Sequence, residues 1–263
     1  MDTLPAVLLA MALVAPQSHE ARDSSSDERY LAELRERVAR GDAEAEVALG
    51  NLYESGQSVL PPDPARAAEW YRRAADKGHP GAQFNLANMY LDGLGVPKDA
   101  GEAVAWYRKA ADQGDTLAQF SLGSIYDTGA GRVPRDNASA ALWYRRAADR
   151  GLATAQYRLG MMHLHGRGVP RDTAQAVAWL RKAAHQDETD AQIALGTLLS
   201  PERRDVVEAH MWLNLAASRW KNEAQRLEAV TRRDGLAAVM TSGQLVEAYR
   251  RATEWQNAHA LPQ

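Results

Sequence analysis

The sequence predicts an all-α solenoid, a row of helical hairpins repeated along the chain, and three observations lead to this prediction. Nearly the same phrase recurs as AEWYRRAADKG, AWYRKAADQG, ALWYRRAADRG and VAWLRKAAHQD. Its tryptophans are evenly spaced: the steps between Trp70, Trp106, Trp143, Trp179 and Trp212 are 36, 37, 36 and 33 residues. Within each unit, apolar residues recur at the three- and four-residue steps of amphipathic helices.

The N-terminal residues carry an export pattern. An uncharged apolar run from Leu4 to Ala15 is too short to span a bilayer as a helix, but it suits the apolar region of a signal peptide. Ala10 and Ala12 supply a small-x-small cleavage pattern. We therefore expect a cleaved signal peptide over residues 1–15 and a flexible linker over 16–26. No Lys or Arg precedes the run, and the alternative is a disordered or packed N-terminus, with an anchored helix least favoured.

Each repeated unit holds two helical patterns. The first places apolar and tyrosine residues at four-residue steps, beginning with Ala45, Leu49 and Tyr53 and recurring from Ala82, Ala118 and Ala155. The second is a stripe at i, i+3, i+4 and i+7. Its copies are Ala67, Trp70, Tyr71 and Ala74; Ala103, Trp106, Tyr107 and Ala110; Ala140, Trp143, Tyr144 and Ala147; and Ala176, Trp179, Leu180 and Ala183.

The segments between these helices predict turns and caps. Glycine and proline in GLGVPKD, GAGRVPRD and GRGVPRD end the first helix of a unit. We expect an aspartate to cap the second helix in each copy, at Asp63, Asp99, Asp136 and Asp172. Gly78, Gly114 and Gly151 then end the second helices. The Arg-Arg and Arg-Lys pairs in the last turns suit the helix dipole and need no phosphate ligand to explain them.

In this order and at this period, Ala, Leu-Gly, Tyr, Gly-x-Gly-Val, Asp, Ala, Trp-Tyr and Ala-Ala resemble the Sel-one-like repeat (SLR), a relative of the tetratricopeptide repeat. The resemblance covers four full repeats, at 42–77, 78–113, 114–150 and 151–186, and a degenerate fifth at 187–219. Residues 27–41 resemble the second helix of a half repeat and are expected to form an N-terminal capping helix. Residues 220–258 resemble the capping helices of the family, with Thr241 and Gln244 as a capping box, and 259–263 form a tail.

This resemblance implies a right-handed α/α superhelix that binds other proteins. Family members serve in bacteria as adaptors in envelope complexes, in signalling and at host contacts. If the first helices line the concave face, as they do in this superfamily, two sets of residues become candidates for binding a peptide or protein. They are Val47, Phe84, Phe120 and Tyr157, and the varying residues four positions later, Asn51, Asn88, Ser124 and Met161. The aromatic residues are equally compatible with packing between helices.

No residue pattern predicts catalysis, a cofactor or a metal site. The chain has no cysteine, and its net charge of -3 argues against nucleic acid as a partner. His163 and His165 point to different sides of a helix, and His163 stands where other copies have tyrosine, so we expect a packed imidazole. Ser218 to Lys221 matches S-x-x-K without its partner motifs.

We therefore predict a non-catalytic scaffold or adaptor that binds a peptide or protein and is a bacterial cell-envelope or signalling-regulatory protein. The alternative is a hydrolase or β-lactam-binding enzyme of the SLR type. The N-terminal pattern predicts a periplasmic or secreted protein with no transmembrane segment in its mature form. The alternative location is the cytoplasm.

Overall fold

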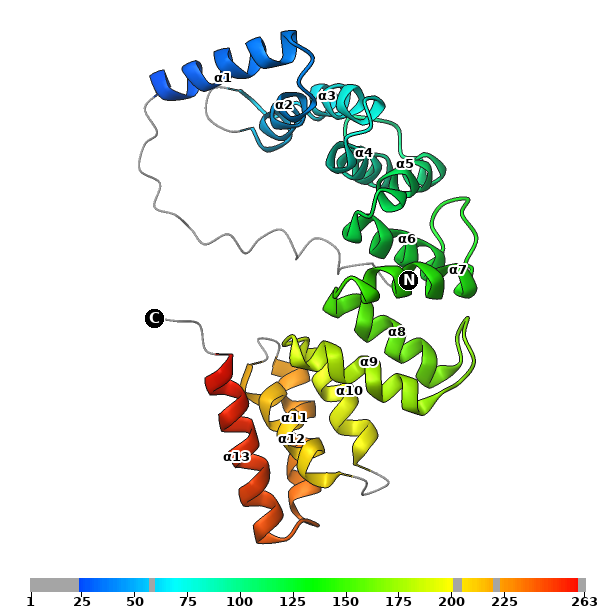
Figure 1. Ribbon diagram of the computed structural model, residues 1–263, viewed down its shortest axis with the longest axis vertical. Coiled ribbons are helices and arrows are strands. Elements are labelled where there is room, and N and C mark those ends of the chain that lie inside the picture. The colour runs from blue at the N-terminus through cyan, green and yellow to red at the C-terminus, as the bar shows by residue number, and fades with distance from the viewer. Residues whose placement is uncertain (1–23, 57–59, 201–204, 220–222, 260–263) are drawn as a thin grey trace. The chain divides into compact units, whose positions relative to one another are not determined.

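The computed structural model describes residues 24–56, 60–200, 205–219 and 223–259. In these ranges the chain forms thirteen α-helices and no β-strand (Figure 1). They are α1 (Ser24–Ala39), α2 (Ala43–Ser55), α3 (Pro64–Asp76), α4 (Pro80–Asp92), α5 (Ala100–Asp112), α6 (Thr116–Thr128), α7 (Asn137–Asp149), α8 (Ala153–His165), α9 (Thr173–His185), α10 (Thr189–Leu199), α11 (Val206–Arg219), α12 (Glu223–Ala237) and α13 (Ser242–Ala258).

The chain divides into two compact units, Met1–Lys98 and Asp99–Gln263, which contain α1 to α4 and α5 to α13. Within each unit, successive helices pack against one another in sequence order, which confirms the predicted all-α solenoid. Among the described helices, none combines the length and the apolar character needed to cross a bilayer. The apolar run from Leu4 to Ala15 lies outside the described residues.

In the first unit, α1 covers α2. Leu31, Leu34 and Val38 of α1 are buried against Ala45 and Leu49 of α2. The sequence predicted a capping helix over 27–41, and the observed helix runs from Ser24 to Ala39. Its exposed side is strongly polar, so it shields the apolar face of the first hairpin from water.

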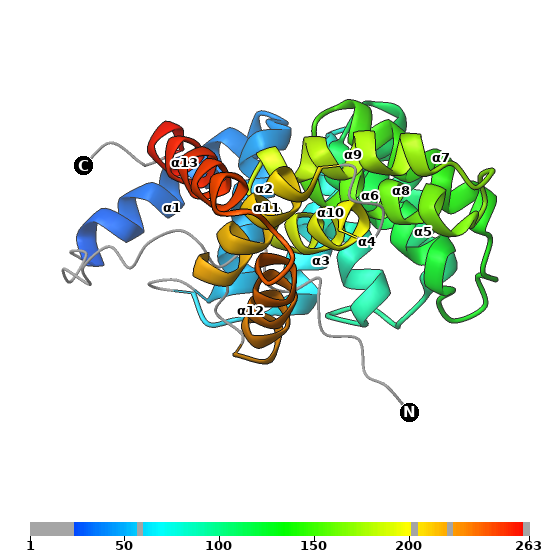
Figure 2. The ribbon, with the colours of Figure 1, turned by 90° about the horizontal axis from the view of Figure 1, so that it is seen from below.

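In the second unit, α12 and α13 complete the row of helices. Both pack against α11, as Figure 2 shows from below. Trp212 of α11 is fully buried, and its ring meets that of Trp255 of α13 edge-on at 6.0 Å. Thr241 and Gln244 form the predicted capping box at the start of α13. These helices bury the apolar end face that a further repeat would otherwise cover.

Close contact between the two helices of a hairpin explains the Leu-Gly pair. A Cβ atom added at Gly50 would lie 2.5 Å from the ring of Tyr71, and one at Gly123 would lie 2.5 Å from the ring of Tyr144. Real Cβ atoms do not approach other atoms so closely. Glycine therefore lets these two tyrosine rings lie directly on the backbone of the first helix, and in the fourth copy Gly160 makes the same room for Leu180.

A buried glutamine joins each first helix to the preceding one. The side-chain amide nitrogen of Gln83, Gln119, Gln156 or Gln192 donates to the carbonyl oxygen eight residues earlier, at 3.0 to 3.3 Å. The first repeat has Glu46 at this place. Its fully buried carboxylate lies 3.0 Å from Arg73 and 2.8 Å from Lys77. The repeat pattern thus satisfies helix-end carbonyl groups that a tight junction would bury.

The predicted caps are confirmed. Asp63, Asp99, Asp136 and Asp172 accept hydrogen bonds from backbone N–H groups in the first turns of α3, α5, α7 and α9. Gly78, Gly114 and Gly151 follow the ends of α3, α5 and α7 with positive φ angles of 90°, 94° and 93°.

The paired cations make specific contacts with other side chains, in addition to their favourable interaction with the helix dipole. The second cation of each pair lies over the tryptophan three residues before it, at 3.5 to 4.5 Å from the ring centroid. The first bonds to another helix: Arg108 donates to the Tyr126 hydroxyl at 3.1 Å, and Arg72 donates to that of Tyr90, each on the next helix in sequence. In the fourth copy, Arg181 of α9 instead donates to Glu208 of α11 at 2.7 Å. Both cations therefore serve packing, in agreement with the structural interpretation of these pairs.

Candidate functional site

We define the first-helix face as the eight residues predicted to bind a partner, four in each unit. In the first unit, Val47 and Asn51 lie on α2, and Phe84 and Asn88 lie on α4. Asn51 is exposed and the other three are half-buried. The Asn51 side-chain oxygen accepts a hydrogen bond from the Tyr71 hydroxyl at 2.6 Å and lies 3.5 Å from the Asn85 amide nitrogen. Asn51 is therefore held in place by the hairpin while its outer edge meets solvent.

In the second unit, the face consists of Phe120 and Ser124 on α6 and Tyr157 and Met161 on α8, all half-buried. The Phe120 ring lies 5.5 Å from the Tyr144 ring, at an interplanar angle of 44°. Tyr157 and Met161 pack against the buried cluster around α9, α10 and α11. Phe84, Phe120 and Tyr157 are thus neither fully buried nor fully exposed, so each packs in part against other helices and is in part accessible to solvent.

Charged groups border this part of the face. Asp127 is buried, and its carboxylate accepts a hydrogen bond from Arg167 at 3.0 Å. Burial, together with the negative charge of Asp127, raises the pKa of Tyr144 to about 12. At the start of α10, the carboxylate of the N-cap residue Glu188 accepts a hydrogen bond from the hydroxyl of Thr154 on α8, at 3.3 Å. Burial and the nearby charge of Asp190 raise the pKa of Glu188.

The two histidines of the MHLHG segment have different surroundings. His163 is buried, with its Nε2 atom 3.3 Å from Nη2 of Arg145, whereas His165 is exposed. A guanidinium group can only donate, so Nε2 of His163 accepts in this contact. The predicted packed and hydrogen-bonded imidazole is confirmed for His163.

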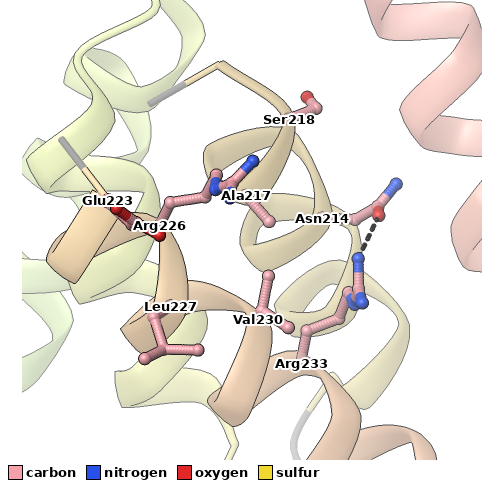
Figure 3. Close-up of a pocket in the computed structure, with 8 residues that line it drawn as sticks. All are labelled: Asn214, Ala217, Ser218, Glu223, Arg226, Leu227, Val230 and Arg233. Carbon is pink, nitrogen blue, oxygen red and sulfur yellow. Dashed lines mark hydrogen bonds between the residues drawn. The ribbon is translucent and has the colours of Figure 1, made fainter. Parts of the chain in front are cut away.

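Ser218, the first residue of the S-x-x-K pattern, lines a hollow between α11 and α12 (Figure 3). The hollow has a volume of about 300 Å³, and Asn214 and Arg233 form a hydrogen bond of 3.3 Å at one side of it. The Ser218 hydroxyl donates to the carbonyl of Leu215 at 2.8 Å, so its proton is used in a hydrogen bond to the backbone near the end of α11. Lys221 lies outside the described residues.

Three groups escaped the sequence-based prediction. Glu46, Arg158 and His210 are buried or half-buried, and none belongs to the repeated pattern. Two of them could have been found in the sequence, because they differ from the residues at equivalent positions of other copies. Glu46 replaces the recurring glutamine, and Arg158 stands where other copies have Asn85 or Ser121. His210 is fully buried in α11, and neither ring nitrogen has a hydrogen-bond partner among the residues that the structure describes.

Comparison with known proteins places this arrangement in a family. The model of the Sel1 repeat matches residues 43–79, 80–115, 116–152, 153–188 and 189–219. The chain belongs to the Sel1 repeat family. Sel1 repeats generally mediate protein–protein interactions, and proteins built from them are generally non-catalytic scaffolds.

Two solved structures extend the likeness to most of the chain. The first is c5321, a protective antigen present in uropathogenic Escherichia coli strains that displays an SLR fold; it has 33% sequence identity and a TM-score of 0.72 over 88% of this chain and 49% of the antigen. The second is a Sel1 repeat protein from Oxalobacter formigenes, with 26% identity and a TM-score of 0.71 over 89% of this chain and 96% of that protein. The chain thus spans about half of the antigen's length. No curated protein matches the sequence.

Proposed function

We propose that this Sel1 repeat protein is a non-catalytic scaffold that binds a peptide or protein segment on its first-helix face. One observation carries the proposal: this face holds half-buried side chains that differ from copy to copy, such as Asn88, Ser124 and Met161. Residues that vary on a constant frame can encode the choice of partner. The half-buried rings of Phe120 and Tyr157 would add contact area at little cost in side-chain entropy.

The residues that recur are already used inside the fold. Alanine, leucine and glycine close the hairpins, the buried glutamines bond to carbonyl groups, and the aspartates cap helices. The cations of the repeat lie on tryptophan rings or bond to another helix, as Arg146, Arg108 and Arg181 show. Because these groups already make contacts or hydrogen bonds within the fold, we expect the varying positions to recognise the partner.

We further propose that the protein acts in the bacterial cell envelope, in an adaptor or signalling role. The apolar run from Leu4 to Ala15 supports export, and both structural relatives are bacterial proteins. Mass spectrometry of the mature protein purified from the bacterium tests this location. A mature N-terminus close to residue 16, in a periplasmic or secreted fraction, is expected. An intact N-terminus in the cytosolic fraction would exclude export.

Site-specific photo-crosslinking in living cells tests the binding face. A benzophenone amino acid would replace Ser124 or Met161, one variant at a time, and Leu142 would be the control, because this leucine is 53% exposed on α7. We expect both face variants to form the same discrete crosslinked species and the Leu142 variant to form none. Equal crosslinking from all three positions, or none from the face, would refute binding at this surface.

A further inference from the structure

Glu54 is an exposed carboxylate that the first unit holds in place by a hydrogen bond. Its Oε2 atom accepts from the Tyr71 hydroxyl at 2.6 Å, and the same hydroxyl lies 2.6 Å from the side-chain oxygen of Asn51. Burial first, and the Glu54 carboxylate second, raise the pKa of Tyr71, so this hydroxyl keeps its proton. One proton cannot fill both contacts, and the two acceptor groups can therefore take a hydrogen bond from a further donor.

Within the residues that the structure describes, Glu54 forms no ion pair. The two first helices of this unit, α2 and α4, contain four carboxylates and no lysine or arginine. Glu46 is already paired with cations at 3.0 and 2.8 Å, and Glu44 lies 2.9 Å from His79. Glu54 differs from both, because its charge is fixed in position, accessible and not neutralised by a neighbour.

The second unit shows which group fits such a carboxylate. Asp127 is the residue equivalent to Glu54, since it follows Ser124 by three positions, as Glu54 follows Asn51. Arg167 donates to Asp127 at 3.0 Å from the Gly-x-Gly-Val segment that follows α8. In this unit, a guanidinium group therefore lies beside the carboxylate.

The first unit has the same segment without the cation. Leu94 takes the place of Arg167: it lies between the two glycines of a Gly-x-Gly-Val segment, 40 residues after Glu54. The internal ion pair of the second unit spans the same 40 residues. Leucine cannot form an ion pair, and Leu94 is 48% exposed. The carboxylate that an internal arginine neutralises in one unit is thus left for an external cation in the other.

We propose that Glu54 and Asn51 bind an arginine side chain of the partner protein, beside the part of the first-helix face that lies in the first unit. This inference rests on the proposed function and adds a basic residue to the partner. The two acceptor oxygens each lie 2.6 Å from one hydroxyl, so they are at most twice that distance apart. A planar guanidinium group offers several N–H donors at once and suits such a pair better than an ammonium group does.

Titration of the full-length chain with N-acetyl-L-arginine amide tests the site. The isotope-labelled protein is followed by NMR, through the side-chain amide signal of Asn51. We expect saturable shifts with the arginine compound. N-acetyl-L-citrulline amide, which has the same shape without the charge, should bind about fivefold more weakly or less. N-acetyl-L-lysine amide should also bind more weakly than the arginine compound, because it keeps the charge but not the planar group.

Matched variants complete the design. Glu54→Gln should weaken binding of the arginine compound by about fivefold or more. Its melting temperature should stay the same, because glutamine still offers an oxygen to the Tyr71 hydroxyl. The control Glu69→Gln, at an exposed carboxylate of α3, should bind like the wild type. Leu94→Arg should lose binding, because the introduced guanidinium group occupies the site as its counterpart does in the second unit.

Several results would overturn the inference. They are the absence of saturable binding, equal binding of the arginine compound and either of the other two, arginine binding that survives Glu54→Gln, and full arginine binding by Leu94→Arg. The scaffold function is judged separately by crosslinking at Ser124 and Met161 in the second unit, so either proposal can fail without the other.

Discussion

Nη2 of Arg145 lies 3.3 Å from Nε2 of His163, in the place where Arg108 of the preceding repeat donates to the Tyr126 hydroxyl. The contact joins α7 to α8 in the same way that its counterpart joins α5 to α6. In this copy, however, the other ring nitrogen of the histidine is buried and has no hydrogen-bond partner in the described part of the chain.

Replacing His163 with tyrosine should therefore stabilise the protein. The tyrosine hydroxyl accepts the hydrogen bond of Arg145, and no buried nitrogen remains unsatisfied. We expect the melting temperature of His163→Tyr to rise by about 2 °C, measured by circular dichroism. The exposed neighbour provides the control, since His165→Tyr should leave the melting temperature unchanged. A fall in the His163→Tyr variant would show that the smaller ring is required for packing.

Gly123→Ala should destabilise the second unit. The added methyl group would lie 2.5 Å from the ring of Tyr144, so the hairpin has to open. We expect the free energy of unfolding to fall by about 1 to 3 kcal/mol in urea titration. Gly235→Ala is the matched control, because this helical glycine has no atom within 4 Å of the added methyl group, and alanine should raise stability there by about 0.5 to 1 kcal/mol. Equal effects at both glycines would contradict the steric explanation.

Gln119→Leu tests the buried glutamine that recurs in the repeat. The side-chain nitrogen donates to the carbonyl of Ala111 at 3.0 Å, and leucine cannot replace this bond. Unfolding in urea should show a loss of about 1 kcal/mol. The same substitution at Gln175, exposed on α9, should change stability by less than about 0.5 kcal/mol.

Stability should fall on acidification because of His210. Burial first, and the charge of Arg233 second, lower the pKa of this histidine, while Asp234 partly offsets them; the Tyr249 ring covers the imidazole at 5.1 Å. A lowered pKa in the folded state means that the unfolded chain binds the proton more readily. The stabilisation is therefore complete above the unfolded value of about 6.5 and decreases as pH falls toward the folded value.

Urea titrations between pH 7.5 and pH 5 measure this effect. His210→Phe should show a smaller loss of stability over that range than the wild type, and the exposed-site control His165→Phe should retain the wild-type loss. Some loss should persist in His210→Phe, because burial also lowers the pKa of His185. A wild-type curve that is flat between pH 7 and pH 5 would contradict the assignment.

Ser218 should not react with a β-lactam. Its hydroxyl donates to the Leu215 carbonyl at 2.8 Å, and an activated serine instead needs a base positioned to accept that proton. Intact-mass spectrometry after incubation with benzylpenicillin should show the unmodified mass. An acyl adduct that disappears in Ser218→Ala would instead support the hydrolase alternative.

The sequence predicted the features that depend on near neighbours along the chain. Helix caps such as Asp99 and Asp136 involve contacts within a few residues, and the stripe that contains Trp106 and Tyr107 is a spacing along a single helix. The repeat makes these patterns easier to recognise, because the same residue types recur at equivalent positions in successive copies. The chemistry of a cap or of a helical period is local, so its residues can be recognised without knowing what lies opposite them.

The exposure of the residues on the candidate face could not be predicted from the repeat. Repeat spacing located Phe120 and Tyr157, but spacing carries no information about how much of a side chain its neighbours cover. The half-buried state of Phe120 follows from the ring of Tyr144, which belongs to the opposite helix of the hairpin. Exposure of this kind is a property of the assembled hairpins.

The sequence by itself determined the class of fold, the repeat and the family, because packing identical hairpins requires the same small and aromatic residues in every copy. Only the tertiary structure decided which charges find partners: Asp127 and Arg167 are 40 residues apart in the sequence, and folding brings them within 3.0 Å of each other. It likewise revealed the unpartnered imidazole of His210. Whether a polar group is satisfied depends on atoms contributed by distant segments, and that information exists only after the chain has folded.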